Sequence, residues 1–201
     1  MDQPAPKPEP EADHANPWTT LERRAIYENP WIAVREDRTI RPDGQPGIYG
    51  VVHFKNRAIG VLPVDADGHV WLVGQYRYPL DAYSWEIPEG GGPEGEAPEE
   101  TARRELREET GLIAGRLESL GQAHLSNSVS DEVAHLFRAT ELTRGDAEPE
   151  GTERLQVRRV DWPTARAMVL DGRITDAMSV IALLHEAVRR SSGEGPPPSQ
   201  E

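Results

Sequence analysis

Residues 90–112 read GGGPEGEAPEETARRELREETGL, a glycine-rich loop followed by a segment with the periodicity of an amphipathic helix. Pro98 suits the first turn of a helix, because its missing N–H has no partner to lose there. Gly111 suits the left-handed position at which helices end. The spacing therefore predicts a helix from Pro98 to Thr110, entered from a flexible loop.

Three glutamates of this helix, Glu105, Glu108 and Glu109, stand at i, i+3 and i+4 and therefore share one face. Like charges on one face repel, and either solvent or a bound cation relieves the repulsion. A solvated face is the usual explanation for a glutamate-rich helix taken alone. The preceding glycines and the adjacent Arg104 favour a cation, since Mg²⁺ prefers oxygen ligands. The segment thus predicts a site for Mg²⁺ or Mn²⁺.

The same residues resemble the Nudix box, whose pattern is G-x5-E-x7-R-E-U-x-E-E-x-G-U. Gly90, Glu96 and the run from Arg104 to Leu112 fill every fixed position of that pattern. The resemblance implies an α+β fold, the Nudix αβα sandwich with a mixed central sheet, preceded by an N-terminal antiparallel strand region. It extends to most of residues 18–190.

Hydrophobic periodicity predicts a strand-rich N-terminal half and helices that return towards the C-terminus. Strands are expected at residues 31–40, 48–54, 58–64, 69–76, 112–124, 133–140 and 154–160. Further helices are expected at residues 164–170 and 176–188. This mixture places helices beside a mixed sheet, which is the α+β class.

The two ends of the chain differ in composition from the part between them. Residues 1–17 and 191–201 are rich in proline, glycine and charged side chains, so they bury too little apolar surface to offset the entropy of ordering. We expect disordered tails there. Between them we expect an N-terminal β region at 18–58 and a Nudix hydrolase domain at 59–190.

The Nudix resemblance also implies roles for the charged residues of the box. It implies that Glu105 and Glu109 hold the metal ion, and that Glu108 is a further ligand or a catalytic partner. The resemblance further implies that the carbonyl of Glu89 completes the metal shell and that Arg104 orients the glutamates by ion pairing. Family members cleave a nucleoside diphosphate joined to another group, and the metal lowers the pKa of the attacking water.

Segments upstream of the box narrow the branch of the family. Residues 75–77 (QYR) and 85–91 (WEIPEGG) are similar to segments of ADP-ribose and nucleoside diphosphate sugar pyrophosphatases. Arg77 suits a diphosphate, because a guanidinium matches phosphate geometry, and Glu86 suits sugar hydroxyls or the metal. Gln75 belongs to the same substrate-binding segment. The structural alternatives are a surface charge at a strand end for Arg77 and a loop carboxylate for Glu86.

Residues 125–132 read LSNSVSDE, where the ADP-ribose branch usually carries a proline in a motif like PSPG-x-S-D-E. This departure widens the expected substrates to nucleoside diphosphate sugars in general, such as ADP-ribose, ADP-glucose and GDP-mannose. The products would be a nucleoside monophosphate and a sugar phosphate.

In that branch the general base lies on a loop after the box. The stretch GDAEPEGTER at 145–154 offers Glu148, Glu150 and Glu153 before the next strand. Glu153 is the first candidate because it adjoins the strand, and Glu150 is the second. A solvated acidic loop is the alternative explanation for all three.

Three aromatic residues, Tyr27, Trp31 and Phe54, fall in the N-terminal strand region. Related enzymes exchange segments between two protomers there and stack an aromatic ring on the base. The resemblance therefore implies a homodimer and makes Trp31 a candidate substrate-binding residue. Burial in the core is the alternative for each aromatic ring.

Composition limits the partners and the cellular location that the chain can have. The chain has 22 Lys and Arg against 35 Asp and Glu, a net charge of −13, which argues against a nucleic-acid partner. It contains no cysteine and no apolar run of the ~20 residues that a membrane span needs. We expect a cytoplasmic protein without a membrane partner. The alternatives to a sugar substrate are a nucleoside triphosphate, a dinucleoside polyphosphate, coenzyme A, or binding without turnover as a nucleotide-sugar sensor.

Overall fold

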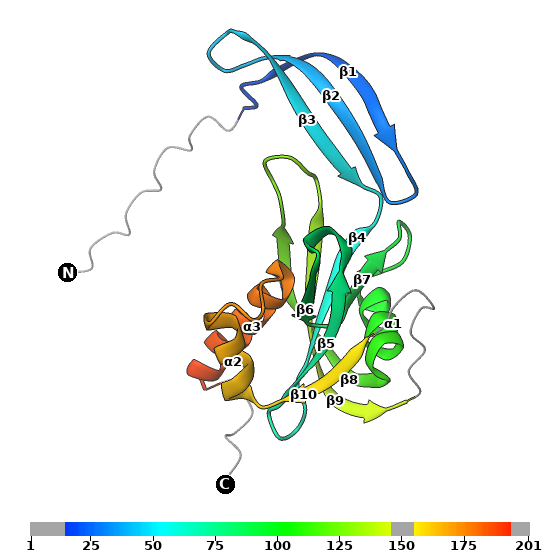
Figure 1. Cartoon of the computed structure of the whole chain (residues 1–201), viewed down its shortest axis with the longest axis vertical. Helices are drawn as coiled ribbons and strands as arrows, with labels where there is room; N and C mark the ends of the chain where they lie inside the picture. Colours follow the sequence, from blue (N-terminus) through cyan, green and yellow to red (C-terminus); the bar gives the residue numbers. More distant parts are fainter. Residues whose placement is uncertain (1–14, 146–154, 194–201) are drawn as a thin grey trace, which may run out of the picture.

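The structure, a computed structural model, describes residues 15–145 and 155–193. These residues form three sheets flanked by helices, with the N-terminal sheet set apart from the rest (Figure 1). The N-terminal sheet has the order β1-β2-β3 and is antiparallel throughout. Its strands are β1 (Thr19–Glu28), β2 (Ile32–Ile40) and β3 (Pro46–Phe54).

The central sheet is mixed and has the order β7-β4-β9-β8. Strands β4 and β9 run parallel, whereas β4 with β7 and β8 with β9 are antiparallel. A parallel pair needs a long crossover, and the chain between β4 and β9 supplies it with a hairpin and a helix. The strands are β4 (Arg57–Pro63), β7 (Glu89–Gly92), β8 (Leu112–His124) and β9 (Val133–Arg144).

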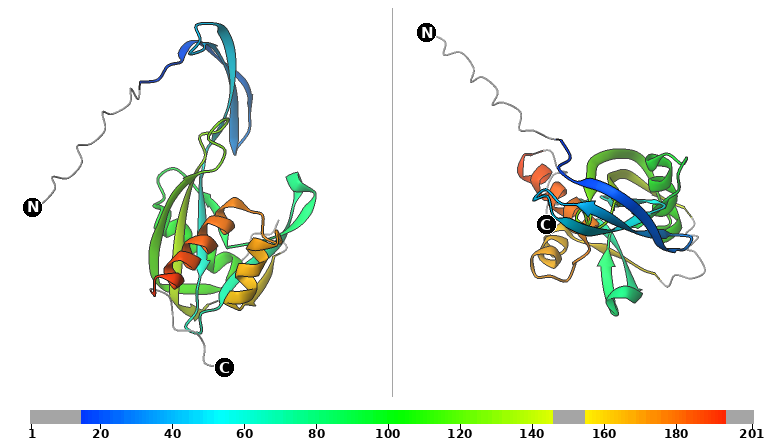
Figure 2. Two further views of the ribbon diagram at one scale, coloured as in Figure 1. Left: turned by 90° about the vertical axis from the view of Figure 1, so that its left-hand side faces the viewer. Right: turned by 90° about the horizontal axis from the view of Figure 1, so that it is seen from above.

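The third sheet has the order β10-β5-β6 and is antiparallel. A short 3-10 helix, η1 (Tyr78–Leu80), joins β5 to β6, and this hairpin projects from the body (Figure 2). The strands are β5 (Val70–Arg77), β6 (Ala82–Glu86) and β10 (Gln156–Val160). The helices are α1 (Pro98–Thr110), α2 (Trp162–Leu170) and α3 (Ala177–Ser191).

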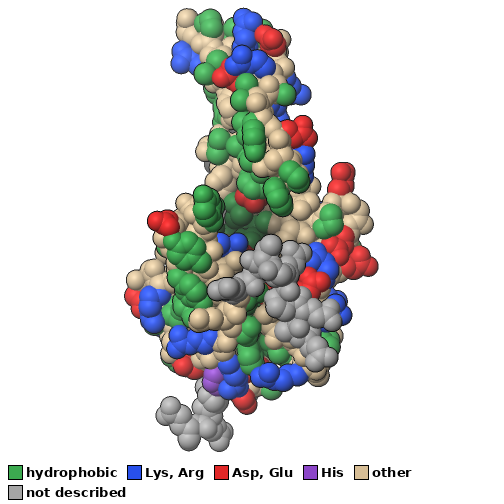
Figure 3. All heavy atoms as spheres, turned by 45° about the vertical axis from the view of Figure 1, so that its right-hand side comes forward, with side chains coloured by type: hydrophobic (Ala, Val, Ile, Leu, Met, Phe, Trp, Pro, Cys, Tyr) green, Lys and Arg blue, Asp and Glu red, His purple; other side chains and the backbone are tan. Residues whose placement is uncertain are grey.

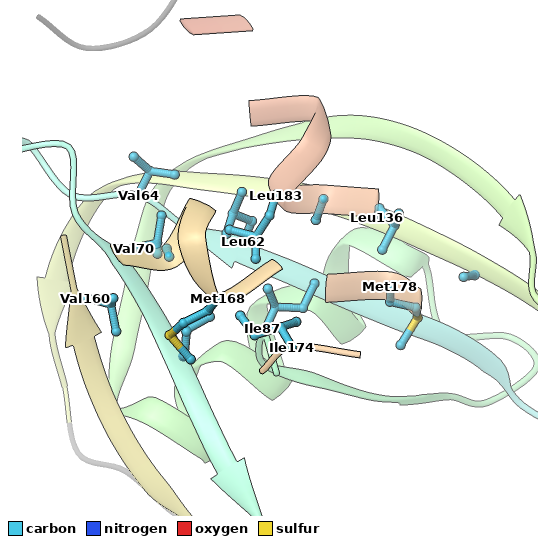
Figure 4. Close-up of a cluster of buried hydrophobic side chains, with 14 residues drawn as sticks. Leu62, Val64, Val70, Ile87, Leu136, Val160, Met168, Ile174, Met178 and Leu183 are labelled. Atoms are coloured by element: carbon cyan, nitrogen blue, oxygen red, sulfur yellow. The ribbon is translucent and has the colours of Figure 1, made fainter. Parts of the chain in front are cut away.

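Two apolar clusters lie on opposite sides of the central sheet. One joins α2 and α3 to β4, β5 and β9, with Leu62, Leu72 and Leu183 buried in it (Figure 4). The other lies under α1, where Ala102 and Leu106 are fully buried. The helices thus cover both faces, which confirms the expected α+β sandwich with a mixed central sheet.

Most of the predicted elements are present with small shifts at their ends. The helix at Pro98–Thr110 has the predicted bounds, and Gly111 adopts the left-handed conformation with φ 69°. The sequence did not predict β1, β6 or β7. Strand β6 is only five residues long and β7 is mostly glycine, so neither shows a clear strand pattern, and both form by pairing with β5 and β4.

The N-terminal sheet is attached to the body through β3 and the segment at 126–131. Val52 N–H donates to Val129 O at 2.8 Å, and the Tyr49 hydroxyl donates to Ser128 O at 2.8 Å. Strand β1 is exposed along its whole length. None of the helices in the described part of the chain has the length and apolar character that a membrane crossing requires.

Candidate active site

The segment 86–89 joins β6 to β7 and lies where three elements meet. Pro88 O accepts a hydrogen bond from Val61 N–H of β4 at 2.8 Å. Glu89 N–H donates to Glu109 Oε2 of α1 at 3.0 Å. The backbone of this segment therefore connects the central sheet to the glutamate face of the helix.

Arg77, at the end of β5, lies against two carboxylates of this segment. Its Nε donates to both oxygens of Glu86 at 3.0 Å, and its Nη2 donates to Glu86 Oε2 at 2.6 Å and to the Glu89 carboxylate. Gln75 Nε2 also donates to Glu86, at 3.4 Å. Glu86 is 2% exposed, and its carboxylate is occupied by Arg77 and Gln75.

Burial and ion pairing shift the pKa values of Arg77 and Glu89. Burial opposes the charge of Arg77, but the hydrogen bond to Glu86 and the charge of Glu89 outweigh it and raise the pKa of Arg77. Burial, together with the nearby charges of Asp176 and Glu86, raises the pKa of Glu89 well above its usual value, although Arg77 opposes that shift. An additional positive charge at Glu89 would favour its ionised form.

Arg104 gathers the carboxylates of the helix. Its Nη1 donates to Glu105 Oε1 at 2.7 Å and to Glu108 Oε2 at 3.0 Å, and its Nη2 donates to Gly91 O at 3.1 Å. It also pairs with Glu96 at 3.2 Å. The hydrogen bond to Glu96 is the main reason why the pKa of Arg104 is raised. Arg104 therefore ties the helix to the preceding loop.

The glutamates of the helix share one face, but their environments differ. Glu109 is 4% exposed, whereas Glu105 and Glu108 are half-buried. Gly90 approaches Glu105 so closely that a Cβ at position 90 would overlap the Glu105 carboxylate. The glycine thus leaves the room that this carboxylate occupies.

The residues present fit a hard divalent cation. Glu89 Oε2 is buried and has no hydrogen-bond partner among residues 15–145 and 155–193. A buried carboxylate oxygen left in this way is costly, and a cation relieves it. The candidate ligands Glu105, Glu108, Glu109 and Glu89 are all oxygen donors, which is the donor type that Mg²⁺ and Mn²⁺ accept.

A cleft of about 380 Å³ opens beside this group at the junction between the N-terminal sheet and the body. It is lined by Trp31, Arg77 and Glu89, together with Glu132 and Met178. Trp31 is 67% exposed, so its ring is available to a ligand rather than packed in the core. The surface is hollowed at this junction (Figure 3).

The structure thus brings together predicted residues from distant parts of the sequence. Trp31, Arg77 and Glu89 line one cleft, and Glu86 binds Arg77 and also accepts a hydrogen bond from Gln75. Arg104 holds Glu105 and Glu108 on the adjoining helix. The candidate general bases Glu153 and Glu150, and also Glu148, lie outside the described residues.

Three residues near this site were not predicted from the sequence, namely Glu132, Asp176 and Met178. Burial raises the pKa of Glu132, which lines the cleft. Glu132 is the last residue of the segment 125–132, which was compared above with the PSPG-x-S-D-E motif, and that match was a signal that it borders the site. Met178 and Asp176 come from the start of α3, and a helix-capping aspartate gives no sign of what lies opposite it.

A second group of potential metal ligands lies elsewhere, in the turn between β4 and β5. Oxygen or nitrogen atoms of Asp65, Asp67 and His69 lie within 4.8 Å of one another. Arg159 pairs with both aspartates at 2.6 Å. That arginine binds both aspartates and offsets part of their charge, so the ion pairs account for this turn without a metal.

The chain matches two protein families along its length. The NUDIX domain family matches residues 54–182, and the nucleoside diphosphate sugar hydrolase N-terminal domain matches residues 18–52. A solved structure titled "Crystal structure of ADP compounds hydrolase" has the same fold, with a TM-score of 0.81 at 21% identity. The match covers 91% of this chain and 100% of that chain.

Two curated relatives are similar over most of their length. ADP-ribose pyrophosphatase of Bacillus subtilis (strain 168) is 31% identical over 166 residues, which is 82% of this chain and 89% of that protein. ADP-ribose pyrophosphatase of Mycobacterium tuberculosis is 32% identical over 170 residues, covering 82% and 81%. The chain therefore belongs to the Nudix hydrolase family, in the branch that carries the nucleoside diphosphate sugar hydrolase N-terminal domain.

Proposed function

We propose that this Nudix pyrophosphohydrolase cleaves the diphosphate of nucleoside diphosphate sugars, giving a nucleoside monophosphate and a sugar phosphate. The observation that carries the proposal is the cleft beside α1, which is lined by Trp31, Arg77 and Glu89. An aromatic ring, a guanidinium and oxygen ligands for a cation are the groups that a base, a diphosphate and its metal require. The substrates named for the relatives are consistent with this choice.

The proposed metal ligands are Glu105, Glu109, Glu108 and Glu89, and the proposed ion is Mg²⁺ or Mn²⁺. When bound, the ion neutralises phosphate oxygens and lowers the pKa of a water. Arg104 keeps Glu105 and Glu108 aligned through its two hydrogen bonds. The buried Glu109 is aligned by Glu89 N–H. These contacts fix the carboxylates before the substrate arrives, which reduces the cost of ordering them.

The remaining roles are divided between the substrate and the water. Arg77 faces the cleft and binds the diphosphate with the guanidinium edge that Glu86 and Glu89 leave available, and Trp31 stacks on the base. Glu153, or in second place Glu150, removes a proton from the attacking water.

The variants Glu153→Gln and Glu150→Gln distinguish the two candidates for the general base. The variant that lacks the base should lose about 100-fold in kcat, and the other variant should keep near wild-type activity.

The decisive experiment is a substrate panel with identified products. Purified protein is incubated with ADP-ribose, ADP-glucose, GDP-mannose, a nucleoside triphosphate, a dinucleoside polyphosphate and coenzyme A, each with Mg²⁺ and with Mn²⁺. We expect monophosphate release from the nucleotide sugars. Turnover confined to another member of the panel would assign the site to that substrate, and tight binding of ADP-ribose without product would indicate a sensor.

The exchange Glu109→Gln tests the metal site directly. It keeps the size of a buried side chain and removes its charge, so we expect kcat to fall on the order of 10³-fold and Mn²⁺ binding to weaken in calorimetry. Glu99→Gln is the matched control, because Glu99 is an exposed glutamate in the first turn of the same helix. Equal activity and equal Mn²⁺ affinity for the two variants would contradict the ligand role of Glu109.

The homodimer and the cytoplasmic location belong to the same proposal. The N-terminal sheet carries exposed apolar side chains, including Leu21, Ile26 and Ile48, each more than half exposed. Such a surface favours association with a second copy. Light scattering should give twice the chain mass for the wild type and a smaller mass for Ile48→Glu, and a monomeric wild type would contradict the dimer.

A further inference from the structure

Ser179 lies in the first turn of α3, a helix to which the sequence patterns assign no part in the site. Its side chain is fully buried, and its Oγ accepts a hydrogen bond from Ile87 N–H at 2.8 Å. Its own N–H donates to Asp176 Oδ2 at 2.7 Å, so the helix cap fixes the turn in which it stands. Ser179, which is 92 residues away from Ile87 in sequence, thereby holds the middle of the segment 86–89.

Each residue of the segment 86–89 is held by a contact from another element. The Glu86 side chain is bound by Arg77 of β5, and Pro88 O by Val61 of β4. Glu89 N–H binds Glu109 of α1. Ser179 supplies the contact at the remaining residue, Ile87, from α3.

The contact at Ile87 controls the direction in which the next peptide groups point. Ile87 is fully buried, so its N–H has no access to water and depends on Ser179 for a partner. Loss of that acceptor leaves a buried N–H unpaired, which is costly and favours rotation of the peptide towards another partner, and Glu89 is two residues away. A rotation there changes both the Glu89 carbonyl and the N–H that aligns Glu109.

We propose that Ser179 is a positioning residue of the metal site, which acts through Ile87 on Glu89 and Glu109. The proposal rests on the metal-dependent function proposed above. The competing explanation is that apolar packing alone holds the segment, since Ile87 also lies in the cluster with Met178 and Leu183. If Ser179 positions the site, removal of its hydroxyl weakens cation binding. If apolar packing alone holds the segment, the same removal leaves the cation affinity unchanged.

The test compares Ser179→Ala with Ser179→Thr, which retains the hydroxyl, and with Leu183→Ala. Leu183 is buried on the same helix in the same cluster and lies outside the cleft. Calorimetry measures Mn²⁺ binding to protein without substrate, steady-state kinetics measure kcat and KM, and thermal unfolding measures stability. Ser179→Ala should bind Mn²⁺ about 10-fold more weakly, the usual effect of removing a group that orients a ligand.

In the same variant kcat should fall about 10-fold at fixed Mn²⁺ concentration, while KM for the nucleotide sugar changes less than about twofold. Ser179→Thr should restore most of the Mn²⁺ affinity. Leu183→Ala should lose at least as much thermal stability as Ser179→Ala and keep the wild-type affinity. That combination separates positioning from general destabilisation.

Two results would overturn the proposal while leaving the function intact. One is wild-type Mn²⁺ affinity in Ser179→Ala, and the other is an equal loss of affinity in Leu183→Ala. A wild-type protein that neither binds Mn²⁺ nor turns over any substrate of the panel would overturn both the function and this role of Ser179.

Discussion

Position 90 requires glycine because the Glu105 side chain lies close to it, and not because its backbone adopts a conformation that only glycine favours. A Cβ there would overlap the Glu105 carboxylate, which is the end of a flexible side chain. Such a side chain gives way at little cost in stability, because no backbone needs to move. The consequence of the overlap therefore falls on the position of the carboxylate and not on the fold.

We predict that Gly90→Ala lowers the free energy of unfolding by less than about 1 kcal/mol. Mn²⁺ affinity should nevertheless fall about 10-fold or more, because Glu105 is displaced from its place beside Arg104. Urea denaturation and calorimetry measure the two quantities. Gly50→Ala on β3 is the control, because a Cβ at position 50 has open space. Unchanged Mn²⁺ affinity in Gly90→Ala would refute the role of this glycine.

Among the elements, α3 is joined to the central sheet by a buried charge. Glu186 is fully buried and accepts from Arg138 Nε of β9 and from Arg190 Nε, each at 2.8 Å. Arg190 also donates to Gly68 O in the β4–β5 turn and lies 4.3 Å from the Trp162 ring centroid of α2. One carboxylate thus binds two arginines, one on β9 and one on α3, and so links the helix to the sheet.

Glu186→Gln should destabilise the protein by about 3 kcal/mol, because it leaves the buried Arg138 with only the longer ion pair to Glu118, at 3.4 Å. The control is Glu36→Gln, which breaks the exposed pair with Arg24 and should cost less than about 1 kcal/mol. Urea denaturation at neutral pH measures both. A loss for Glu186→Gln no greater than that for the control would show that this buried cluster contributes little to stability.

At the scale of the whole molecule, Asp131 joins the N-terminal sheet to the body. Its carboxylate contacts His53 Nδ1 at 2.7 Å and accepts from Phe54 N–H at 3.1 Å, both at the end of β3. Burial alone would raise the pKa of Asp131, but these hydrogen bonds and the charge of His53 lower it below the ordinary value of 3.8. The folded state therefore favours the ionised carboxylate.

A carboxylate with a lowered pKa contributes stability that is present above its unfolded pKa and is lost as the pH falls through its folded pKa. We predict that Asp131→Asn is less stable than wild type at pH 7, by less than about 1 kcal/mol because the carboxylate is half-exposed. The difference should begin to shrink as the pH falls towards the ordinary value of 3.8, and it should vanish only below the lowered pKa of folded Asp131, where the wild-type carboxylate becomes protonated.

Urea denaturation of both proteins at pH 7 and at pH 3 checks this dependence. Hydrogen exchange at Val52 N–H, which bonds Val129 O, should be faster in Asp131→Asn at pH 7. A stability difference that persists unchanged at pH 3 would contradict the ionic origin of the contact.

Local patterns in the sequence determined much of the fold and half of the site. Proline at 98, the glutamate spacing and Gly111 define α1 with its observed bounds, because helix ends and faces depend on neighbouring residues. The same periodicity predicts that Glu105, Glu108 and Glu109 share a face. The family resemblance selects Arg77 and Glu86 as separate substrate-binding candidates, and in the structure the two are bound to each other.

Tertiary structure alone decided which distant residues meet. Strands β6 and β7 exist because β5 and β4 offer them unpaired backbone groups, which no local pattern reveals. The burial of Glu109 and Glu186, which lie on helices with many charged residues, depends on what packs opposite each helix. Ser179 reaches Ile87 only because α3 folds back across the sheet. Periodicity specifies the face of an element, whereas the partner of that face is fixed only when the whole chain packs.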